Sequence, residues 1–253
     1  MRGYNGLYLV GNYPDPDTFV RAAVTGLRYF DFLEIGIPFS DPVADGPVIT
    51  DAIETMVEKG LRLDELLESV SVIRRGVSRD KKLYFMTYSN MVYRRGMEKF
   101  GKMCRDNGVQ GVIIPDIPRL ESAAFREAFN SNGVEFIQFA TPENRKEQIT
   151  EVAEDAEGFL YFVSIRGTTG SSLTLDEDTK EKITAARKAS SVPVVLGFGI
   201  RDAATANLAL ENADGFIIGT RIVELLNNGG ITDVENFYRD LAEGLEQAGI
   251  QQP

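Results

Sequence analysis

The sequence contains no histidine and only one cysteine among its 253 residues. Without imidazole side chains, Ser-His-Asp triads, histidine-ligated metals and imidazole acid–base catalysis are excluded. The single cysteine, Cys104, excludes an internal disulfide and a cysteine-based zinc site, and its helical surroundings indicate a buried, inert thiol. Any acid–base chemistry must therefore come from carboxylates, tyrosine or lysine.

Basic residues and long apolar runs are also scarce. Lys and Arg number 27 against 38 Asp and Glu, and the resulting net charge of −11 argues against binding to nucleic acid or to an anionic membrane. No stretch approaches 18 consecutive apolar residues, so no transmembrane helix is expected. The apolar run near the first residue is too short for the core of a signal peptide, and we expect a cytoplasmic protein.

Short apolar runs alternate with longer amphipathic segments along the whole chain. The predicted strands are Gly6–Val10, Phe30–Ile35, Leu83–Met86, Gly111–Ile114, Glu135–Phe139, Phe159–Val163, Val194–Leu196 and Gly215–Ile218. The predicted helices are Pro16–Thr25, Leu63–Gly76, Gly96–Asn107, Glu121–Asn132, Arg145–Ala153, Asp178–Ala189, Asp202–Glu211 and Val234–Ala248. Eight strand–helix units without a linker predict an α/β protein, a single-domain (β/α)8 TIM barrel over residues 1–253; a doubly wound sheet is the alternative.

The stretch LEIGIPFSDPVADG, residues 33–46, places a carboxylate inside an apolar strand. Glu34 alternates with Leu33 and Ile35, so its side chain points to the opposite side of the strand from theirs. A carboxylate in a buried strand must be paired, protonated or used in chemistry, and partial burial would suit Glu34 to proton transfer near neutral pH. The alternative is a structural ion pair, but Arg28 precedes the strand and so lies at the wrong end.

Two further carboxylates, Asp41 and Asp45, follow in a loop rich in proline and glycine. Asp45 could bind a donor on a substrate, cap a turn or act as a second acid–base group. Asp41 comes directly after Ser40 and is expected to brace the loop. Glu34, Asp41 and Asp45 together could hold a hard cation, but their spacing matches no known calcium or magnesium loop.

Glycine-rich turns follow the last two predicted strands. The segment GFGI at Gly197–Ile200 and the pair Gly219–Thr220 each lead into a helical pattern. Glycine lets backbone N–H groups approach an anion, and the loops after strands 7 and 8 form a recurrent phosphate site in TIM barrels. The alternative is that these glycines only make tight turns. The predicted phosphate-binding residues are Gly197, Gly199, Gly219 and Thr220, together with Thr169 and Gly170 of the loop SIRGTTGSS at 164–172.

These motifs together resemble the α subunit of tryptophan synthase. The resemblance runs over nearly the whole chain, through Ser40–Asp41–Pro42, Asp45–Gly46–Pro47, Tyr88 with Asn90, Pro115–Pro118, Ala140–Pro142, Tyr161, the loop at 164–170, GFGI and Gly219. Two features depart from the family pattern. Only about five residues precede the first predicted strand, where members usually carry a helix, and Gly11-Asn12-Tyr13-Pro14 replaces the usual Gly-Asp-Pro.

The resemblance implies the retro-aldol cleavage of indole-3-glycerol phosphate to indole and glyceraldehyde 3-phosphate in tryptophan biosynthesis. By similarity, Glu34 makes both proton transfers and Asp45 receives the indole N–H. By the same similarity, Gly170, Gly199, Gly219 and Thr220 hold the phosphate. The residues expected around the indole ring are Tyr8, Met86, Tyr88, Phe139 and Phe198, and Tyr161 is expected to line the pocket near the reacting centre.

The resemblance also implies a partner, the tryptophan synthase β subunit, in an α2β2 complex. Pyridoxal phosphate is expected only in that β subunit, and this chain is expected to hold no metal or cofactor. Two other functions stay open at this point. One is a different barrel enzyme acting on a phosphorylated substrate, such as a prenyl transferase that uses glycerol phosphate. The other is a regulatory role, in which the barrel mainly activates the partner.

Overall fold

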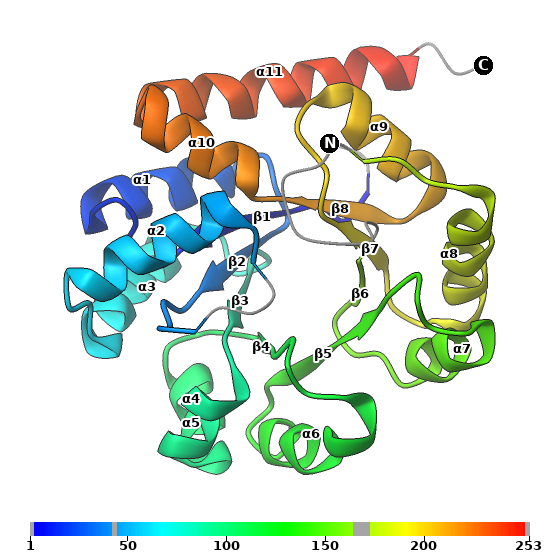
Figure 1. Cartoon of the computed structure of the whole chain (residues 1–253). Helices are drawn as coiled ribbons and strands as arrows, with labels where there is room; N and C mark the ends of the chain where they lie inside the picture. Colours follow the sequence, from blue (N-terminus) through cyan, green and yellow to red (C-terminus); the bar gives the residue numbers. More distant parts are fainter. Residues whose placement is uncertain (1–2, 42–44, 164–172, 251–253) are drawn as a thin grey trace.

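Eight parallel strands form a closed barrel in the computed structural model, which describes residues 3–41, 45–163 and 173–250. The strands follow one another around the barrel in chain order, and the helices surround them (Figure 1). Their bounds are β1 (Gly6–Val10), β2 (Phe32–Gly36), β3 (Lys82–Met86), β4 (Gly111–Ile113), β5 (Glu135–Ala140), β6 (Leu160–Val163), β7 (Val194–Gly197) and β8 (Gly215–Ile218). The predicted TIM barrel is confirmed, and the doubly wound alternative is wrong.

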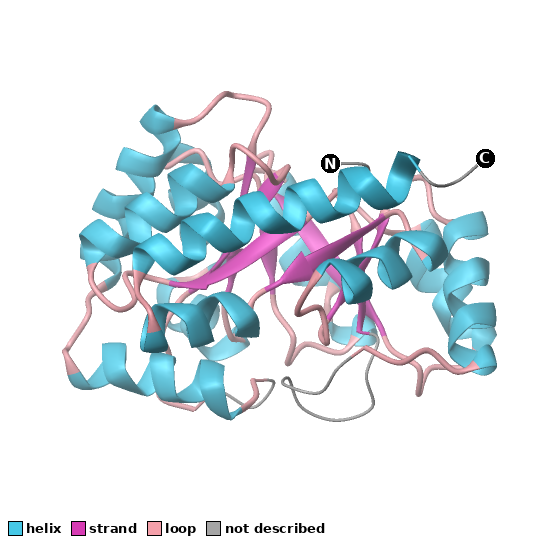
Figure 2. Cartoon of the chain, turned by 90° about the horizontal axis from the view of Figure 1, so that it is seen from above, coloured by secondary structure: helices cyan, strands magenta, loops and turns pink. Residues whose placement is uncertain are grey.

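The helices form an outer layer around the strands (Figure 2). They are α1 (Pro16–Gly26), α2 (Pro47–Glu58), α3 (Leu63–Gly76), α4 (Ser89–Arg95), α5 (Met97–Asp106), α6 (Ala123–Asn130), α7 (Lys146–Glu154), α8 (Glu177–Ala189), α9 (Ala203–Asn212), α10 (Thr220–Asn228) and α11 (Ile231–Ile250), with a 3₁₀ turn η1 at Arg119–Glu121. The eight predicted helices agree with these bounds to within three residues. Among the described residues, no helix is both long enough and apolar enough to cross a membrane.

One helix that matters for the site, α2, was not among the predicted helices. It lies in the connection after β2, and its buried residues Ile49, Ala52, Ile53 and Met56 have the spacing of an amphipathic helix. Pro47 occupies its first turn, where the missing N–H costs nothing. The proline- and glycine-rich segment before α2 obscured this pattern in the sequence.

Alternation along the strands builds two separate cores. Leu33 and Ile35 of β2 belong to the outer core, between the barrel and its helices. Phe32 of the same strand belongs to the inner core, which fills the barrel with side chains from the other strands. The side chain of Glu34 has the same parity as Phe32 and therefore points into the barrel, as the alternation predicted.

Glycines in neighbouring strands make room for the large rings of the inner core. A Cβ atom on Gly36 would collide with the phenol of Tyr8, and one on Gly197 would collide with the ring of Tyr161. Each glycine lies at the carboxyl end of its strand, next to the strand that carries the ring. These two contacts place the hydroxyl ends of Tyr8 and Tyr161 at the carboxyl end of the barrel.

An aromatic cluster fills the opposite, amino-terminal end of the barrel. The rings of Tyr4 and Phe159 both stack on Phe32, with centroids 4.9 Å apart in each pair, and Tyr84 meets Phe159 edge to face at 5.2 Å. The hydroxyls of Tyr4 and Tyr84 are 3.2 Å apart, and Tyr84 donates to Glu135 at 3.1 Å. Phe32, Tyr84 and Phe159 are buried, so this cluster closes the base of the barrel.

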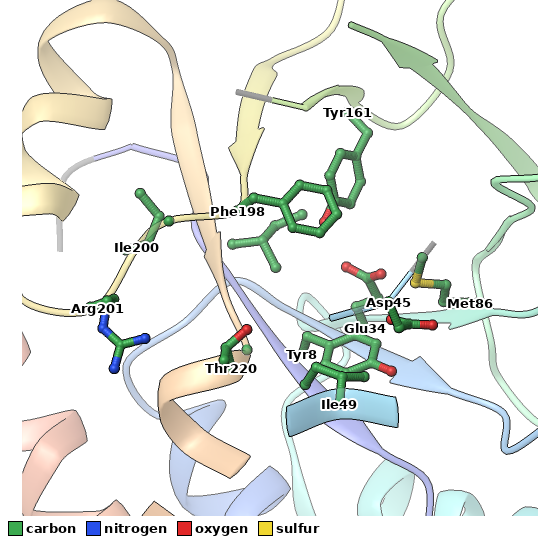
Figure 3. Close-up of a pocket in the computed structure, with 13 residues that line it drawn as sticks. Tyr8, Glu34, Asp45, Ile49, Met86, Tyr161, Phe198, Ile200, Arg201 and Thr220 are labelled. Carbon is green, nitrogen blue, oxygen red and sulfur yellow. The ribbon is translucent and has the colours of Figure 1, made fainter. Parts of the chain in front are cut away.

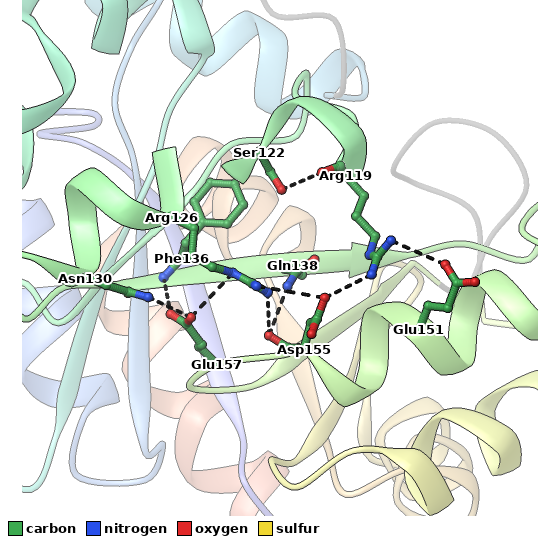
Figure 4. Close-up of polar contacts among 9 residues, drawn as sticks. All are labelled: Arg119, Ser122, Arg126, Asn130, Phe136, Gln138, Glu151, Asp155 and Glu157. Carbon is green, nitrogen blue, oxygen red and sulfur yellow. Dashed lines mark hydrogen bonds and ion pairs between the residues drawn. The ribbon is translucent and has the colours of Figure 1, made fainter. Parts of the chain in front are cut away.

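A polar network on the outside of the barrel fixes the connection between β4 and α6. Arg119 of η1 binds Asp155 at 2.9 Å and Glu151 at 3.3 Å, and both carboxylates lie at or near the end of α7 (Figure 4). Arg126 of α6 adds a hydrogen bond of 2.7 Å to the backbone carbonyl of Asp155. The network ties η1 and α6 to α7 and so holds the chain that follows β4.

Candidate active site

A pocket with about 520 Å³ of empty space opens at the carboxyl end of the barrel. It is the place where TIM barrels carry their chemistry, because the connections after the strands gather there. Figure 3 shows the two carboxylates among aromatic and aliphatic side chains. The lining residues are Tyr8, Glu34, Asp45, Ile49, Met86, Tyr161, Phe198, Gly199, Ile200, Arg201, Ile217, Gly219 and Thr220.

Glu34 is fully buried at the pocket wall. Within the part of the chain that the structure describes, neither of its carboxylate oxygens has a hydrogen-bond partner, so the structural ion pair is not formed there. Burial, together with the nearby charge of Asp45, raises the pKa of Glu34 from 4.5 to about 8. At neutral pH this side chain is therefore largely a protonated acid, and its carboxyl group faces the pocket.

Asp45 approaches Glu34 from the loop before α2 and is half-buried. The hydroxyl of Tyr88 donates a hydrogen bond of 2.8 Å to its Oδ2 atom. Burial raises the pKa of Asp45, and the bond from Tyr88 offsets part of that rise because it stabilises the carboxylate. Asp41 accepts a bond of 2.6 Å from the hydroxyl of the adjacent Ser40, and its role in bracing the loop stays a prediction.

The glycine-rich turns after β7 and β8 meet on another side of the same pocket. Phe198 and Gly199 both have positive φ, 74° and 79°, so the chain makes a left-handed turn directly after β7. Both residues of this turn line the pocket. Gly219 precedes α10, and no side chain caps that helix at Gly219. The first N–H groups of a helix lack partners inside it, so Thr220 starts a helix whose N-terminus suits an anion.

Three of the predicted residues lie just behind the pocket wall. Tyr88 acts on the pocket through its bond to Asp45. Phe139 packs against Tyr161 with ring centroids 4.8 Å apart, and Gly197 is buried beneath the same tyrosine ring. Thr169 and Gly170 lie outside the described residues. Burial raises the pKa values of Tyr8 and Tyr161 well above 10, so both rings line the pocket as neutral phenols.

Four lining residues were missed at the sequence level. Ile49 belongs to α2, which was not among the predicted helices. Ile217 has the inward parity of β8, so alternation along that strand indicates its direction. Ile200 is the last residue of the GFGI segment and Arg201 directly follows it; the glycine pattern indicates a turn there and carries no signal for either side chain. Among the described residues, no three His, Cys, Asp or Glu side chains are grouped so that they could hold a metal ion.

Comparison with known proteins agrees with this geometry. The family model described as tryptophan synthase alpha chain matches residues 7–248. The tryptophan synthase alpha chain of Aquifex aeolicus is 36% identical over 242 residues, covering 95% of this chain and 92% of that protein.

Solved structures of the same kind superpose closely. A Mycobacterium tuberculosis tryptophan synthase structure has a TM-score of 0.87 at 29% identity, covering 96% of this chain and 93% of that one. A structure of the tryptophan synthase α2β2 complex from Pyrococcus furiosus has a TM-score of 0.86 at 27% identity, covering 98% of this chain and 100% of that one. Because the family model and the relatives span nearly the whole chain, and the barrel carries its two carboxylates at the expected mouth, this protein belongs to the tryptophan synthase alpha chain family.

Proposed function

We propose that Glu34 and Asp45 catalyse the reaction of this lyase family in the described pocket, the cleavage of indole-3-glycerol phosphate to indole and glyceraldehyde 3-phosphate. One observation carries the assignment. Glu34 is a fully buried carboxyl group without a described hydrogen-bond partner, and it lines a pocket whose other end is made of glycine turns. A buried polar group left without a partner is costly to the fold, which is typical of a group kept for chemistry.

The proton transfers can be balanced on Glu34 alone. Its carboxylic acid donates a proton to the indole carbon that bears the glycerol side chain, which makes a cationic indolenine. The carboxylate left on Glu34 accepts the proton of the adjacent side-chain hydroxyl as the carbon–carbon bond breaks. The bonding electrons return to the ring to give indole, the hydroxyl becomes an aldehyde, and Glu34 ends protonated. A pKa near neutrality suits a group that must both give and take a proton.

Asp45 supports this step by charge. As a carboxylate it accepts the indole N–H and stabilises the positive charge that develops on the ring when the carbon is protonated. The bond from Tyr88 both orients Asp45 and favours its ionised form. The pair thus divides the work between a protonated acid, Glu34, and an ionised partner, Asp45.

The remaining lining residues orient the substrate. Tyr8, Met86, Tyr161 and Phe198 offer apolar and aromatic surface for a planar indole ring. The turn at Gly199 and the start of α10 at Thr220 offer backbone N–H groups for the phosphate. With the phosphate held there, the reacting carbon is directed toward the carboxylates.

We further propose a β subunit as partner in an α2β2 assembly, with pyridoxal phosphate held by that partner, and a place of action in the cytoplasm. The assembly named for the Pyrococcus furiosus structure and the 98% coverage of this chain by that superposition support the first point. The closed base of the barrel leaves the carboxyl face as the side from which indole reaches a partner.

The test is indole formation from indole-3-glycerol phosphate by the purified chain, alone and with a β subunit. The wild-type protein should release indole, and Glu34→Gln should fold but lose activity by at least about a thousandfold. Full activity in Glu34→Gln would remove Glu34 from the mechanism. Turnover of a prenyl donor with glycerol phosphate, and indifference to indole compounds, would replace the lyase by the alternative barrel enzyme.

A further inference from the structure

The side chain of Tyr8 runs along the pocket from the turn after β8 to the two carboxylates. At one end, a Cβ atom on Gly219 would lie 3.0 Å from both Cβ and Cδ1 of Tyr8, so the base of the tyrosine packs against that turn. At the other end, a Cβ atom on Gly36 would collide with the Tyr8 hydroxyl, so this hydroxyl lies at the end of β2, the strand that carries Glu34. Figure 3 shows the Tyr8 ring between Thr220 and the two carboxylates.

The Tyr8 hydroxyl has no hydrogen-bond partner within the described ranges of the chain. The residue is 7% exposed, and it lines the pocket. Burial, followed by the charges of Asp45 and Glu34, raises the pKa of Tyr8 well above 10, so the hydroxyl is a neutral donor close to both carboxylates. The hydroxyl of Tyr88, by contrast, already donates to Asp45.

A ligand that fills the pocket removes the water available to the Tyr8 hydroxyl. A hydroxyl that loses its water and gains no other partner lowers the binding free energy of the complex. In the proposed reaction, the substrate carries a three-carbon chain between its phosphate and its ring, and two of those carbons bear hydroxyl groups. Because Tyr8 runs between the same two ends of the pocket, the chain passes along it, and a hydroxyl of the chain can pair with that of the tyrosine.

We propose that Tyr8 is a specificity-determining residue whose hydroxyl binds a hydroxyl group on the glycerol chain of the substrate. This inference rests on the proposed function, which places the phosphate at Gly199 and Thr220 and the reacting carbon at Glu34. A site that hydrogen-bonds a ligand hydroxyl rejects an analogue without it, because the protein group is then left unpaired in the dehydrated pocket. Tyr8 thus adds selectivity for hydroxylated phosphates to an otherwise apolar wall.

Two other roles for the Tyr8 hydroxyl make different predictions. If the tyrosine only packs through its ring, loss of the hydroxyl changes the affinity of no ligand. If the hydroxyl donates to Asp45 or Glu34 in the complex, its loss slows the reaction but leaves the affinity for an unreactive hydroxylated ligand unchanged. Only a bond to the ligand makes the affinity depend on the hydroxyls of the ligand itself.

A second phenol, that of Tyr161, also lies near the carboxylates, because the charges of Glu34 and Asp45 add to the effect of burial on its pKa. Its ring borders Gly197, however, whereas the atoms nearest to a Cβ on Gly219 belong to Tyr8. Tyr8 is therefore the phenol that reaches from the carboxylates to the turn after β8.

The experiment uses calorimetry on the full-length protein with two ligands, glycerol 3-phosphate and propyl phosphate, which lacks both hydroxyls. The wild type should prefer glycerol 3-phosphate. Tyr8→Phe should weaken glycerol 3-phosphate binding about fivefold and keep propyl phosphate binding within about twofold of the wild type. The matched control is Tyr238→Phe, which removes a hydroxyl from a fully buried ring of the outer core that has no partner among the described residues. That control should keep the wild-type preference.

Steady-state kinetics give a second readout. Tyr8→Phe should lower kcat/KM for indole-3-glycerol phosphate about fivefold. Inhibition by 3-(indol-3-yl)propyl phosphate, the substrate analogue without either hydroxyl, should keep its wild-type inhibition constant. An unchanged constant shows that the pocket of the variant is intact.

Four results would overturn the inference and leave the proposed function standing. They are equal affinities of the wild type for the two phosphates, an unchanged preference in Tyr8→Phe, slower turnover of Tyr8→Phe with unchanged glycerol 3-phosphate affinity, and loss of the preference in Tyr161→Phe alone. A wild-type protein that neither binds glycerol 3-phosphate nor releases indole would overturn the proposed function itself.

Discussion

Tyr88 donates a hydrogen bond of 2.8 Å to Asp45, and this bond joins the strand-3 connection to the loop before α2. It is the described contact that fixes the second carboxylate in the pocket. Because the bond favours the charged form of Asp45, it also opposes the rise in pKa that burial imposes. Orientation and ionisation of Asp45 therefore depend on one phenol.

Tyr88→Phe should separate these effects from the packing of the ring. Without the hydroxyl, the pKa of Asp45 rises further, and we expect the kcat/KM for indole-3-glycerol phosphate at neutral pH to fall about tenfold. The acid side of the pH–rate profile should move to higher pH. The check is a full profile of the variant; an unmoved acid limb would show that Tyr88 only packs against its neighbours.

The pH dependence of the wild-type reaction follows from the two carboxyl groups. Activity should rise with pH as Asp45 ionises, because the carboxylate is the form that stabilises the cationic ring. It should fall again as Glu34 loses its proton with a pKa of about 8, because the protonated form starts the reaction. Measurement of kcat/KM from pH 5 to 10 checks both limbs. A profile flat through pH 8 would contradict the assignment of Glu34 as the acid.

Glu34 should also make the folded state sensitive to alkaline pH. Its pKa is raised on folding from 4.5 to about 8, so its contribution to stability is fully present below about pH 4.5 and is lost as pH rises through about 8. Glu34→Gln removes this loss. The variant should match the wild type near pH 4.5 and exceed it by a few kcal/mol in free energy of unfolding at pH 9. Urea denaturation at the two pH values gives the difference; equal stabilities at pH 9 would show that Glu34 titrates normally.

Gly197→Ala tests what the last residue of β7 does. A Cβ there would collide with the ring of Tyr161, so we expect a loss of about 1–3 kcal/mol in stability and a lower kcat, with little change in glycerol 3-phosphate affinity. Gly76→Ala, where the nearest side-chain atom is a methyl group of Val24 at 3.3 Å, is the control and should be nearly neutral. A specific loss of phosphate affinity in Gly197→Ala would instead support a direct role in phosphate binding.

Much of the barrel was readable from periodicity, since runs such as Gly6–Val10 and Gly215–Ile218 coincide with strands to the residue. The inward direction of Glu34 also followed, because alternation on a strand leaves a side chain only two directions. Both predictions rest on local regularities. They needed no knowledge of which segments meet in space.

The parts that could not be read depend on contacts between distant segments. The bond between Tyr88 and Asp45 spans 43 positions, and neither residue type specifies the other. The phosphate-binding role of Gly197 stays a prediction, and its burial beneath Tyr161 depends on the register of β6 against β7, which the local sequence does not specify. Arg201 was missed because its place beside Glu224 depends on how α10 packs, which the GFGI segment does not encode.

The aromatic cluster of Tyr4, Phe32, Tyr84 and Phe159 leaves the barrel open at one end only. A small apolar product formed in the pocket cannot leave through the amino-terminal end of the barrel, so it has to leave by the opening through which the substrate entered. Substrate entry and product release therefore use the same opening at the carboxyl end of the barrel. A molecule that covers this opening receives the product before the product reaches bulk water.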